Sequence, residues 1–150
     1  MTMSLRCQGL YITNSGITDD EKQIILLDPA FNGTFLGTSE LPEVCTYFRC
    51  SSFNEQFLGA ILAVPHNSQV IELHPALNTS RDYIHAIPKF LELAVMLTRF
   101  MGYQAFAVVP DFLHSVQLYC EKRHGLKGIQ LDSMATFGTK ESKSKVYVIP

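Results

Sequence analysis

The sequence predicts a single α/β domain in which a mixed, mostly antiparallel sheet is flanked by helices. The chain has 150 residues, of which 47% are hydrophobic, so it can bury one compact core but hardly two. Three successive β-type segments at 44–50, 56–65 and 70–75 favour antiparallel pairing. A long helical segment then precedes a β-type run at 104–110. A helix between two strands predicts one parallel pair inside an otherwise antiparallel sheet.

The N-terminal part is predicted as a strand, a helix and a loop. The segment LRCQGLYIT at 5–13 is typical of a strand. Thr18 is a suitable N-cap for the next helix, because acidic residues fill the first turn that follows it. Pro29 is expected to end that helix. The segment 31–43 is rich in turn-forming residues and is predicted as a loop or a short broken helix.

A helical period starts at Ile84 and continues to Gly102, which is a natural C-terminal cap. Pro88 is tolerated in the first turn of this helix, where an N–H group would lack a partner anyway. The central strands before the helix are dense in isoleucine, leucine and valine, so they are expected to be buried on both faces.

The C-terminal part is predicted as a second helix and two strands. The helix covers 111–126, with Asp111 as its N-cap. The strands are GIQLDSMATF (128–137) and KSKVYVIP (143–150), joined around the basic, serine-rich segment KESKSK (140–145).

Composition narrows the possible partners. The formal net charge of −2 gives no electrostatic reason to expect a nucleic acid or an acidic membrane. The N-terminal residues lack the apolar core of a signal peptide, and FLGAILAVP, the longest apolar run, is far too short to span a bilayer. We therefore expect an intracellular, cytoplasmic protein with reduced thiols. Charged residues make up 17% of the chain, below the usual ~25%, which favours a surface partly covered by a protein partner or a second copy.

The histidines and cysteines predict no metal site. None of the five histidines forms an i, i+4 pair, and the four cysteines include no CxxC pair. Cys120 directly follows Tyr119 and so faces elsewhere on the helix, which gives little support to a Cys/His nucleophile.

Three segments resemble the GNAT superfamily of N-acetyltransferases. FLGAILAVP followed by VIELHPAL is similar to the family's central hairpin, whose second strand precedes the cofactor loop. Residues 81–86 (RDYIHA) stand where the family has its R/Q-x-x-G-x-G/A motif, and SVQLYCEKRHGLKG is similar to its A-x-x-L-Y-x-K-x-G-F segment. The resemblance implies a GNAT-like domain over 1–150, with a sheet splayed between the strands at 70–75 and 104–110.

The resemblance also implies a site for acetyl-CoA at the start of the long helix, where unpaired backbone N–H groups favour a pyrophosphate. The residues of this cradle would be Arg81, Ile84, His85 and Ala86. Arg81 and Ala86 match the motif, whereas Ile84 replaces its first glycine. Ile84 either points into the core and leaves amides free, or it occludes the phosphates. Arg81 either binds a phosphate or points into solvent.

Two side chains are candidates for the chemistry that the family performs. A tyrosine at the place of Tyr119 is often the general acid that reprotonates the CoA thiolate, although a half-buried structural tyrosine explains the sequence equally well. Glu72 stands where some members carry a glutamate base, and its other interpretation is an exposed carboxylate. A backbone N–H near Leu73 or His74 would donate to the thioester oxygen. Phe112 replaces the family's usual asparagine.

The function implied by this resemblance is acyl transfer from acetyl-CoA, or a related acyl-CoA, to a small-molecule or protein amine by direct attack. The alternative is a GNAT-like protein that has lost catalysis and serves as a structural or protein-interaction component, for example in a phage particle or a phage–host interaction. The residues that favour the enzyme are Arg81, Ala86, Tyr119 and Glu72. The residues that favour the alternative are Ile84, Phe112 and Pro88. The acceptor would be set by the loops at 28–43 and 133–145.

Overall fold

The computed structural model describes residues 2–32, 41–42 and 45–149 and contains one eight-stranded sheet in the order β1-β2-β3-β4-β5-β6-β8-β7. The strands are β1 (Ser4–Cys7), β2 (Leu10–Thr13), β3 (Thr46–Ser52), β4 (Phe57–Pro65), β5 (Val70–Leu77), β6 (Gln104–Pro110), β7 (Ile129–Phe137) and β8 (Lys140–Ile149). The helices are α1 (Asp19–Leu27), α2 (Pro29–Asn32), α3 (Ile87–Phe100) and α4 (His114–Leu118).

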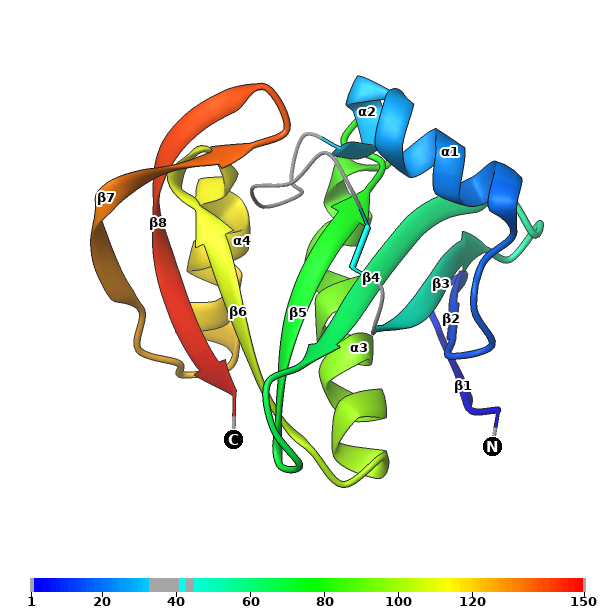
Figure 1. Ribbon diagram of the computed structural model, residues 1–150, viewed down its shortest axis with the longest axis horizontal. Coiled ribbons are helices and arrows are strands. Elements are labelled where there is room, and N and C mark those ends of the chain that lie inside the picture. The colour runs from blue at the N-terminus through cyan, green and yellow to red at the C-terminus, as the bar shows by residue number, and fades with distance from the viewer. Residues whose placement is uncertain (1, 33–40, 43–44, 150) are drawn as a thin grey trace.

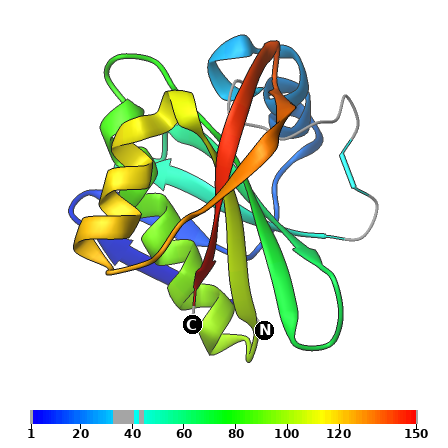
Figure 2. The ribbon, with the colours of Figure 1, turned by 90° about the vertical axis from the view of Figure 1, so that its left-hand side faces the viewer.

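The sheet is mixed, because β5 and β6 are parallel and every other pair of neighbours is antiparallel. Helices α1 and α2 lie over one face of the sheet, and α3 and α4 lie over the other (Figure 1). The view turned by 90° shows the same two helical layers on either side of the strands (Figure 2). The predicted α/β sheet, mostly antiparallel and flanked by helices, is confirmed.

The N-terminal segment differs from the prediction of one strand at 5–13. It forms two antiparallel strands, β1 and β2, joined at Gln8 and Gly9. Both residues have positive φ, 52° and 81°, which is the combination that a two-residue type I′ hairpin turn requires. The apolar residues change from odd positions (Leu5, Cys7) to even positions (Leu10, Ile12) across this turn, a break in the period of two that the prediction of one strand overlooked.

Thr18 caps α1 as predicted, and the cap extends to the sheet. Its hydroxyl accepts from the N–H of Glu21, and the Glu21 carboxylate accepts from the N–H of Thr18, so the two form a capping box. The same carboxylate accepts hydrogen bonds of 2.8 and 3.0 Å from Arg49 on β3. Helix α1 ends at Leu27, before Pro29. Most of the predicted loop at 31–43 lies outside the described residues.

The strand β5 presents different residues to its two faces. Ile71 and Leu73 are buried in the cluster that packs under α3. Because side chains alternate along a strand, Glu72 and His74 point to the opposite face. There Ala76 packs with Ile25 of α1. The strand is thus apolar under α3 and carries polar side chains near α1 and α2.

The sheet opens between β5 and β6. Their parallel pairing runs only from Val70 opposite Gln104 to Leu73 opposite Ala107, although both strands continue for three to four more residues. Figure 1 shows the two strands diverging beyond this point. The predicted splay between the strands at 70–75 and 104–110 is confirmed.

Pro75 gives a physical reason for the place where the pairing stops. The N–H of His66 bonds to the carbonyl of Val70, and the N–H of Gln104 bonds to the carbonyl of Gln69. Backbone groups alternate in direction along a strand, so even-numbered residues of β5 point their polar groups to β4 and odd-numbered residues to β6. The next donor toward β6 after Leu73 would be residue 75, and proline has no N–H group.

Helix α3 starts three residues later than predicted. Residues Ile84–Ala86 form a 3₁₀ turn, and the α-helix begins at Ile87 with Pro88 in its first turn. Its C-terminus ends as predicted at Gly102, which has φ +87°. The N–H of Gly102 bonds to the carbonyl of Arg99, and the N–H of Tyr103 to that of Thr98, the pattern of a Schellman motif.

The predicted helix at 111–126 is divided into three short pieces. Residues Asp111–Leu113 form a 3₁₀ turn, α4 follows, and Tyr119–Arg123 form a π-helical turn. Asp111 is not an N-cap; its carboxylate accepts from the side-chain amide of Gln117 at 2.9 Å. The predicted loop KESKSK is also wrong, because residues 140–145 belong to β8 and pair with β6 or β7.

Candidate functional site

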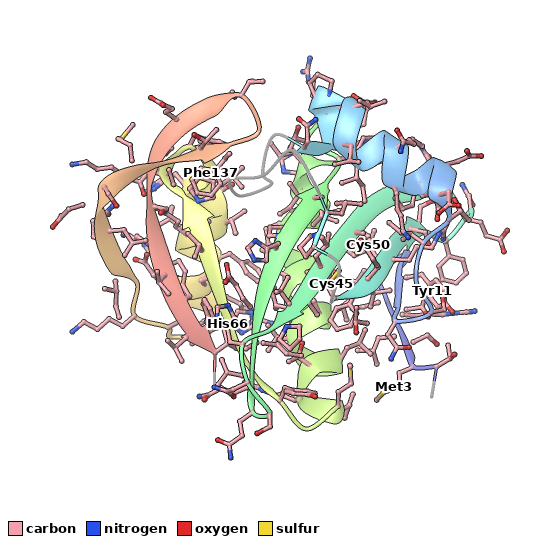
Figure 3. The ribbon with its side chains drawn as sticks, viewed as in Figure 1. Met3, Tyr11, Cys45, Cys50, His66 and Phe137 are labelled. Carbon is pink, nitrogen blue, oxygen red and sulfur yellow. The ribbon has the colours of Figure 1, made fainter. Side chains whose placement is uncertain are left out.

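Glu72 lies between two imidazoles on the face of the sheet opposite α3. The Nε2 atom of His66 is 2.7 Å from Oε1 of Glu72, and the Nε2 atom of His74 is 2.8 Å from Oε2. His74 is two residues further along β5 and therefore shares the face of Glu72. His66 immediately follows β4. Figure 3 shows His66 toward the lower end of the sheet, where β5 and β6 run together.

The Glu72 carboxylate is held in its ionised form. Its side chain is only 13% exposed, and burial alone would raise its pKa. Hydrogen bonds and charge from His74, and then from His66, outweigh burial, so the pKa of Glu72 lies below its ordinary value. Glu72 faces Phe106, one pair before the last paired residues of β5 and β6. The exposed carboxylate of the alternative interpretation is not what the structure shows.

The predicted phosphate cradle is a closed turn with one exposed cation. The N–H groups of Tyr83 and Ile84 bond to the carbonyl of Ser80, and the N–H of Ala86 bonds to that of Tyr83. These three amides are therefore used within the turn. The side chain of Arg81 is exposed, and within the described residues no ion pair or hydrogen bond holds its guanidinium.

The side chain of Ile84 takes the first of its two predicted directions, because it packs against the core cluster under α3. Ala86 packs there too, and His85 between them is exposed. The β-branched residue therefore does not cover the turn from outside. The amide of Ile84 nevertheless bonds to Ser80, so the inward direction of the side chain does not leave that amide free.

Tyr119 lies on the other face of the sheet, in a groove of about 410 Å³ between α3 and the segment that contains α4. Its hydroxyl donates to Oε2 of Glu92 at 2.5 Å, and the same carboxylate is 3.1 Å from Nζ of Lys89. His124 packs edge-on against the tyrosine ring, with centroids 5.1 Å apart. Burial and the Glu92 carboxylate raise the pKa of Tyr119, so the phenol is protonated at neutral pH.

Replacing Tyr119 by phenylalanine should raise the pKa of Glu92 toward its ordinary value of 4.5. The hydrogen bond from the phenol is the largest cause of the lowered pKa of this carboxylate. An NMR titration of the Glu92 side-chain carbon measures the change directly. The variant Tyr103→Phe is the control and should leave the titration of Glu92 unaltered. An unchanged midpoint in Tyr119→Phe would show that the bond between the helices does not form in solution.

The two backbone N–H groups predicted to donate to a thioester oxygen point to different neighbouring strands. By the alternation along β5, the N–H of His74 points to β4 and the N–H of Leu73 points to β6. Leu73 belongs to the last residue pair before the opening. The next position on the same side is Pro75, which has no N–H. Of the two predicted donors, only Leu73 points to the side where the sheet opens.

Other candidate chemistries find little support in the described part of the chain. Burial raises the pKa of the Cys120 thiol to about 11, and it also raises those of Cys45 and Cys50, so these three thiols are protonated at neutral pH. Among the described residues, no group of three or more His, Cys, Asp or Glu side chains is arranged to hold a metal ion. None of the described helices has both the length and the apolar character needed to cross a membrane.

Sequence reasoning missed three participants: His66, the side chain of His74, and Glu92. The signal for His74 was present, since residues two apart on a strand share a face. The signal for His66 was the hairpin itself, which folds the end of β4 back beside Glu72. Glu92 carried no signal, because its contact with Tyr119 joins two helices 27 residues apart.

Comparison with known proteins gives matches in structure and none in sequence. Neither the protein-family models nor the curated proteins match this chain. A GNAT-family acetyltransferase from Bacillus anthracis has a TM-score of 0.68 at 11% identity, with 98% of each chain covered. A spermidine N-acetyltransferase chimera of Vibrio cholerae SpeG and hSSAT has a TM-score of 0.65 at 13% identity, covering 95% of this chain and 96% of its own. A GNAT-family acetyltransferase from Elizabethkingia anophelis with acetyl-CoA bound has a TM-score of 0.57 at 11% identity, covering 95% and 99%.

These similarities extend over nearly the whole length of both chains, at identities too low to carry more than architecture. They cover the eight-stranded sheet of this chain, including its single parallel pair. The chain has the fold of the GNAT acetyltransferases.

Proposed function

We propose that this protein transfers an acyl group from acetyl-CoA, or a related acyl-CoA, to an amine. The observation that carries the proposal is the position of Glu72: an ionised, largely buried carboxylate beside the opening between β5 and β6. Burying a carboxylate between two imidazoles costs desolvation energy, and charged groups held in this way are often functional. A base that removes a proton from an ammonium group is such a function. Solved structures with this fold include acetyltransferases, one with acetyl-CoA bound, which supports the donor.

The reaction divides between the two faces of the sheet. On the face of α1 and α2, Glu72 removes a proton from the acceptor's ammonium group, and the free amine attacks the thioester carbon. The N–H of Leu73 belongs to the last residue pair between β5 and β6, so it would have to leave β6 before it could stabilise the oxyanion. On the face of α3 and α4, the protonated phenol of Tyr119 returns a proton to the CoA sulfur. Tyr119 must first exchange its hydrogen bond to Glu92 for one to the thiolate.

The residues at the start of α3 fit a pyrophosphate only in part. Three amides that a phosphate would use are bonded within the turn, so the cradle differs from the one the motif implies. The exposed guanidinium of Arg81 remains, and guanidinium groups bind phosphate with two parallel hydrogen bonds. In this chain the charged side chain would do more of the binding than the backbone amides of Tyr83, Ile84 and Ala86.

Replacing Arg81 by glutamate should therefore weaken acetyl-CoA binding by roughly 10-fold to 100-fold, the value of one charge-assisted hydrogen bond. Calorimetric titration with acetyl-CoA measures the change. The matched control is Lys127→Glu, which reverses an exposed charge away from the cradle and should leave the affinity unaltered. Equal affinities for acetyl-CoA in the unmodified protein and in Arg81→Glu would show that Arg81 does not bind the phosphates. We prefer this variant to Ile84→Gly, because Ile84 packs against the core and its removal also destabilises the fold.

The second candidate is a GNAT-like protein without catalysis that serves as a structural or protein-interaction component. The observation in its favour is the closed turn at Ser80–Ala86, together with a proline where the opening would need its next N–H donor. In this role the chain would transfer no acyl group and would bind the surface of another protein.

A titration with acetyl-CoA, followed by release of CoA thiol in the presence of primary amines, separates the two candidates. Spermidine and a peptide with a free α-amino group are suitable first acceptors, because they represent a small-molecule and a protein amine. Micromolar binding with amine-dependent thiol release would establish the acyltransferase. If the unmodified protein does not bind acetyl-CoA, the acyltransferase proposal is wrong and the structural role is favoured.

A further inference from the structure

The imidazole of His66 is placed to carry protons between Glu72 and solvent. The ring nitrogen and the carboxylate oxygen are 2.7 Å apart, within the range of a direct hydrogen bond. The His66 side chain is 49% exposed, whereas Glu72 is 13% exposed and His74 16%. His66 is thus the member of this cluster that water reaches most freely.

The fold fixes His66 by three independent contacts. Its N–H bonds to the carbonyl of Val70 and closes the turn between β4 and β5. The side chain of Asn67 accepts from the N–H groups of Gln69 and Val70, which holds the turn rigid. The imidazole also packs edge-on against Phe106 of β6, with centroids 5.1 Å apart. An exposed side chain normally keeps its rotamer freedom, so this degree of fixation indicates a defined position for the ring.

The surroundings of Glu72 leave few routes for a proton. Its cross-strand neighbours are Val64 on β4 and Phe106 on β6, neither of which carries protons. His74 and His66 supply the hydrogen bonds and charge that lower the pKa of this carboxylate. His74 lies on the side of the opening and is mostly buried, while His66 lies on the side of the exposed turn.

We infer that His66 is the exit of a proton relay that restores Glu72 after each acyl transfer, with His74 as the residue that positions the carboxylate. This inference rests on the proposed function. Imidazole suits the task, since it takes up and releases protons near neutral pH. A carboxylic acid formed at Glu72 cannot start another cycle until its proton has left.

The proton balance closes over the three groups. One N–H bond of the acceptor ammonium breaks, its proton goes to Glu72, and the nitrogen keeps the electron pair with which it attacks the thioester. In the ionised site, Nε2 of His66 carries the proton that bonds to Glu72. Once Glu72 is protonated, the imidazole loses this proton to water and takes one up on Nδ1, so Nε2 can then accept the proton of the carboxylic acid. The imidazolium then releases a proton from Nδ1 to water. Glu72 returns to a carboxylate and His66 to a neutral imidazole.

The test is His66→Gln, whose amide nitrogen reaches the position of Nε2 and can hydrogen-bond to Glu72 but cannot relay a proton. Turnover with acetyl-CoA and the best primary amine should fall by roughly 10-fold to 100-fold, within the range of general acid–base effects. The KM for acetyl-CoA should not change, because His66 lies on the opposite face of the sheet from α3. Added imidazole buffer should restore the rate of this variant in proportion to its concentration and leave the unmodified protein unaffected.

The control is His114→Gln, at an exposed histidine outside the site, which should keep the rate of the unmodified protein with or without imidazole. A His66→Gln variant that turns over at the unmodified rate, or that imidazole does not rescue, overturns the relay and leaves the acyltransferase standing. If the unmodified protein binds no acetyl-CoA and releases no thiol, the proposed function fails and the relay fails with it.

Discussion

Replacing Glu72 by glutamine should lower the rate of acyl transfer by roughly 10²-fold to 10⁴-fold, the usual effect of removing a general base. The amide is the same size as the carboxylate and can still bond to both imidazoles, accepting from one ring nitrogen and donating to the other. It cannot accept a proton from an ammonium. Because Glu72 lies on the face opposite α3, the affinity for acetyl-CoA should remain. The thiol released after fixed times gives the rate of acyl transfer, and calorimetry on the same preparation gives the affinity for acetyl-CoA.

The matched control for this substitution is Glu141→Gln, an exposed carboxylate on β8. It removes the same charge and should alter neither rate nor binding. A Glu72→Gln variant that keeps the unmodified rate would assign the base to another group. A loss of acetyl-CoA affinity equal to the loss of rate would indicate a change of fold.

The same variant has a signature in stability that does not depend on activity. The pKa of Glu72 is lowered in the folded protein, so its carboxylate stabilises the fold at pH values above its ordinary value of 4.5. This contribution is lost as the pH falls through the lower value of the folded state. The unmodified protein should thus be more stable than Glu72→Gln at pH 7, and the difference should shrink below pH 4.5. Urea unfolding at several pH values measures it.

Replacing Gly59 by alanine should destabilise the protein by about 2–4 kcal/mol, among the larger effects of a single substitution. Gly59 has φ +119° in β4, opposite Leu77 of β5. A Cβ atom there would lie 2.3 Å from the carbonyl oxygen of Ala76 and 2.8 Å from the Cα atom of Leu77. Both are backbone atoms, so relief requires β4 and β5 to move apart. Thermal unfolding should show a lower Tm, by roughly 4–16 °C for a chain of this size.

Gly9→Ala separates the two causes of this destabilisation. Gly9 also has positive φ, +81°, but nothing lies within 4 Å of its would-be Cβ. Alanine there should cost only the left-handed backbone conformation, about 1–2 kcal/mol. The excess in Gly59→Ala is then the clash with β5. Equal losses of stability in the two variants would mean that the clash is relieved without moving the strand.

The sequence by itself determined the sheet and most of its helices, because their signals are local. Thr18 with Glu21 specifies a capping box, and Gly102 specifies a C-terminal cap, from residues within one turn of each other. The helix between 70–75 and 104–110 required a parallel pair, and the structure contains it. The prediction of one strand at 5–13 overlooked a local signal, because the apolar positions change from odd to even across Gln8 and Gly9.

The tertiary structure alone decided what surrounds each candidate side chain. Glu72 was predicted as a base, but its contact with His66 depends on the hairpin that brings His66 back beside β5. Tyr119 was predicted as an acid, but its bond to Glu92 depends on how two helices pack across the same face. The direction of Ile84 and the hydrogen bonds of the turn that it closes depend on the core beneath them. The bond between Tyr119 and Glu92 joins residues 27 positions apart, and a sequence pattern of period two or 3.6 carries no information about which such residues will meet.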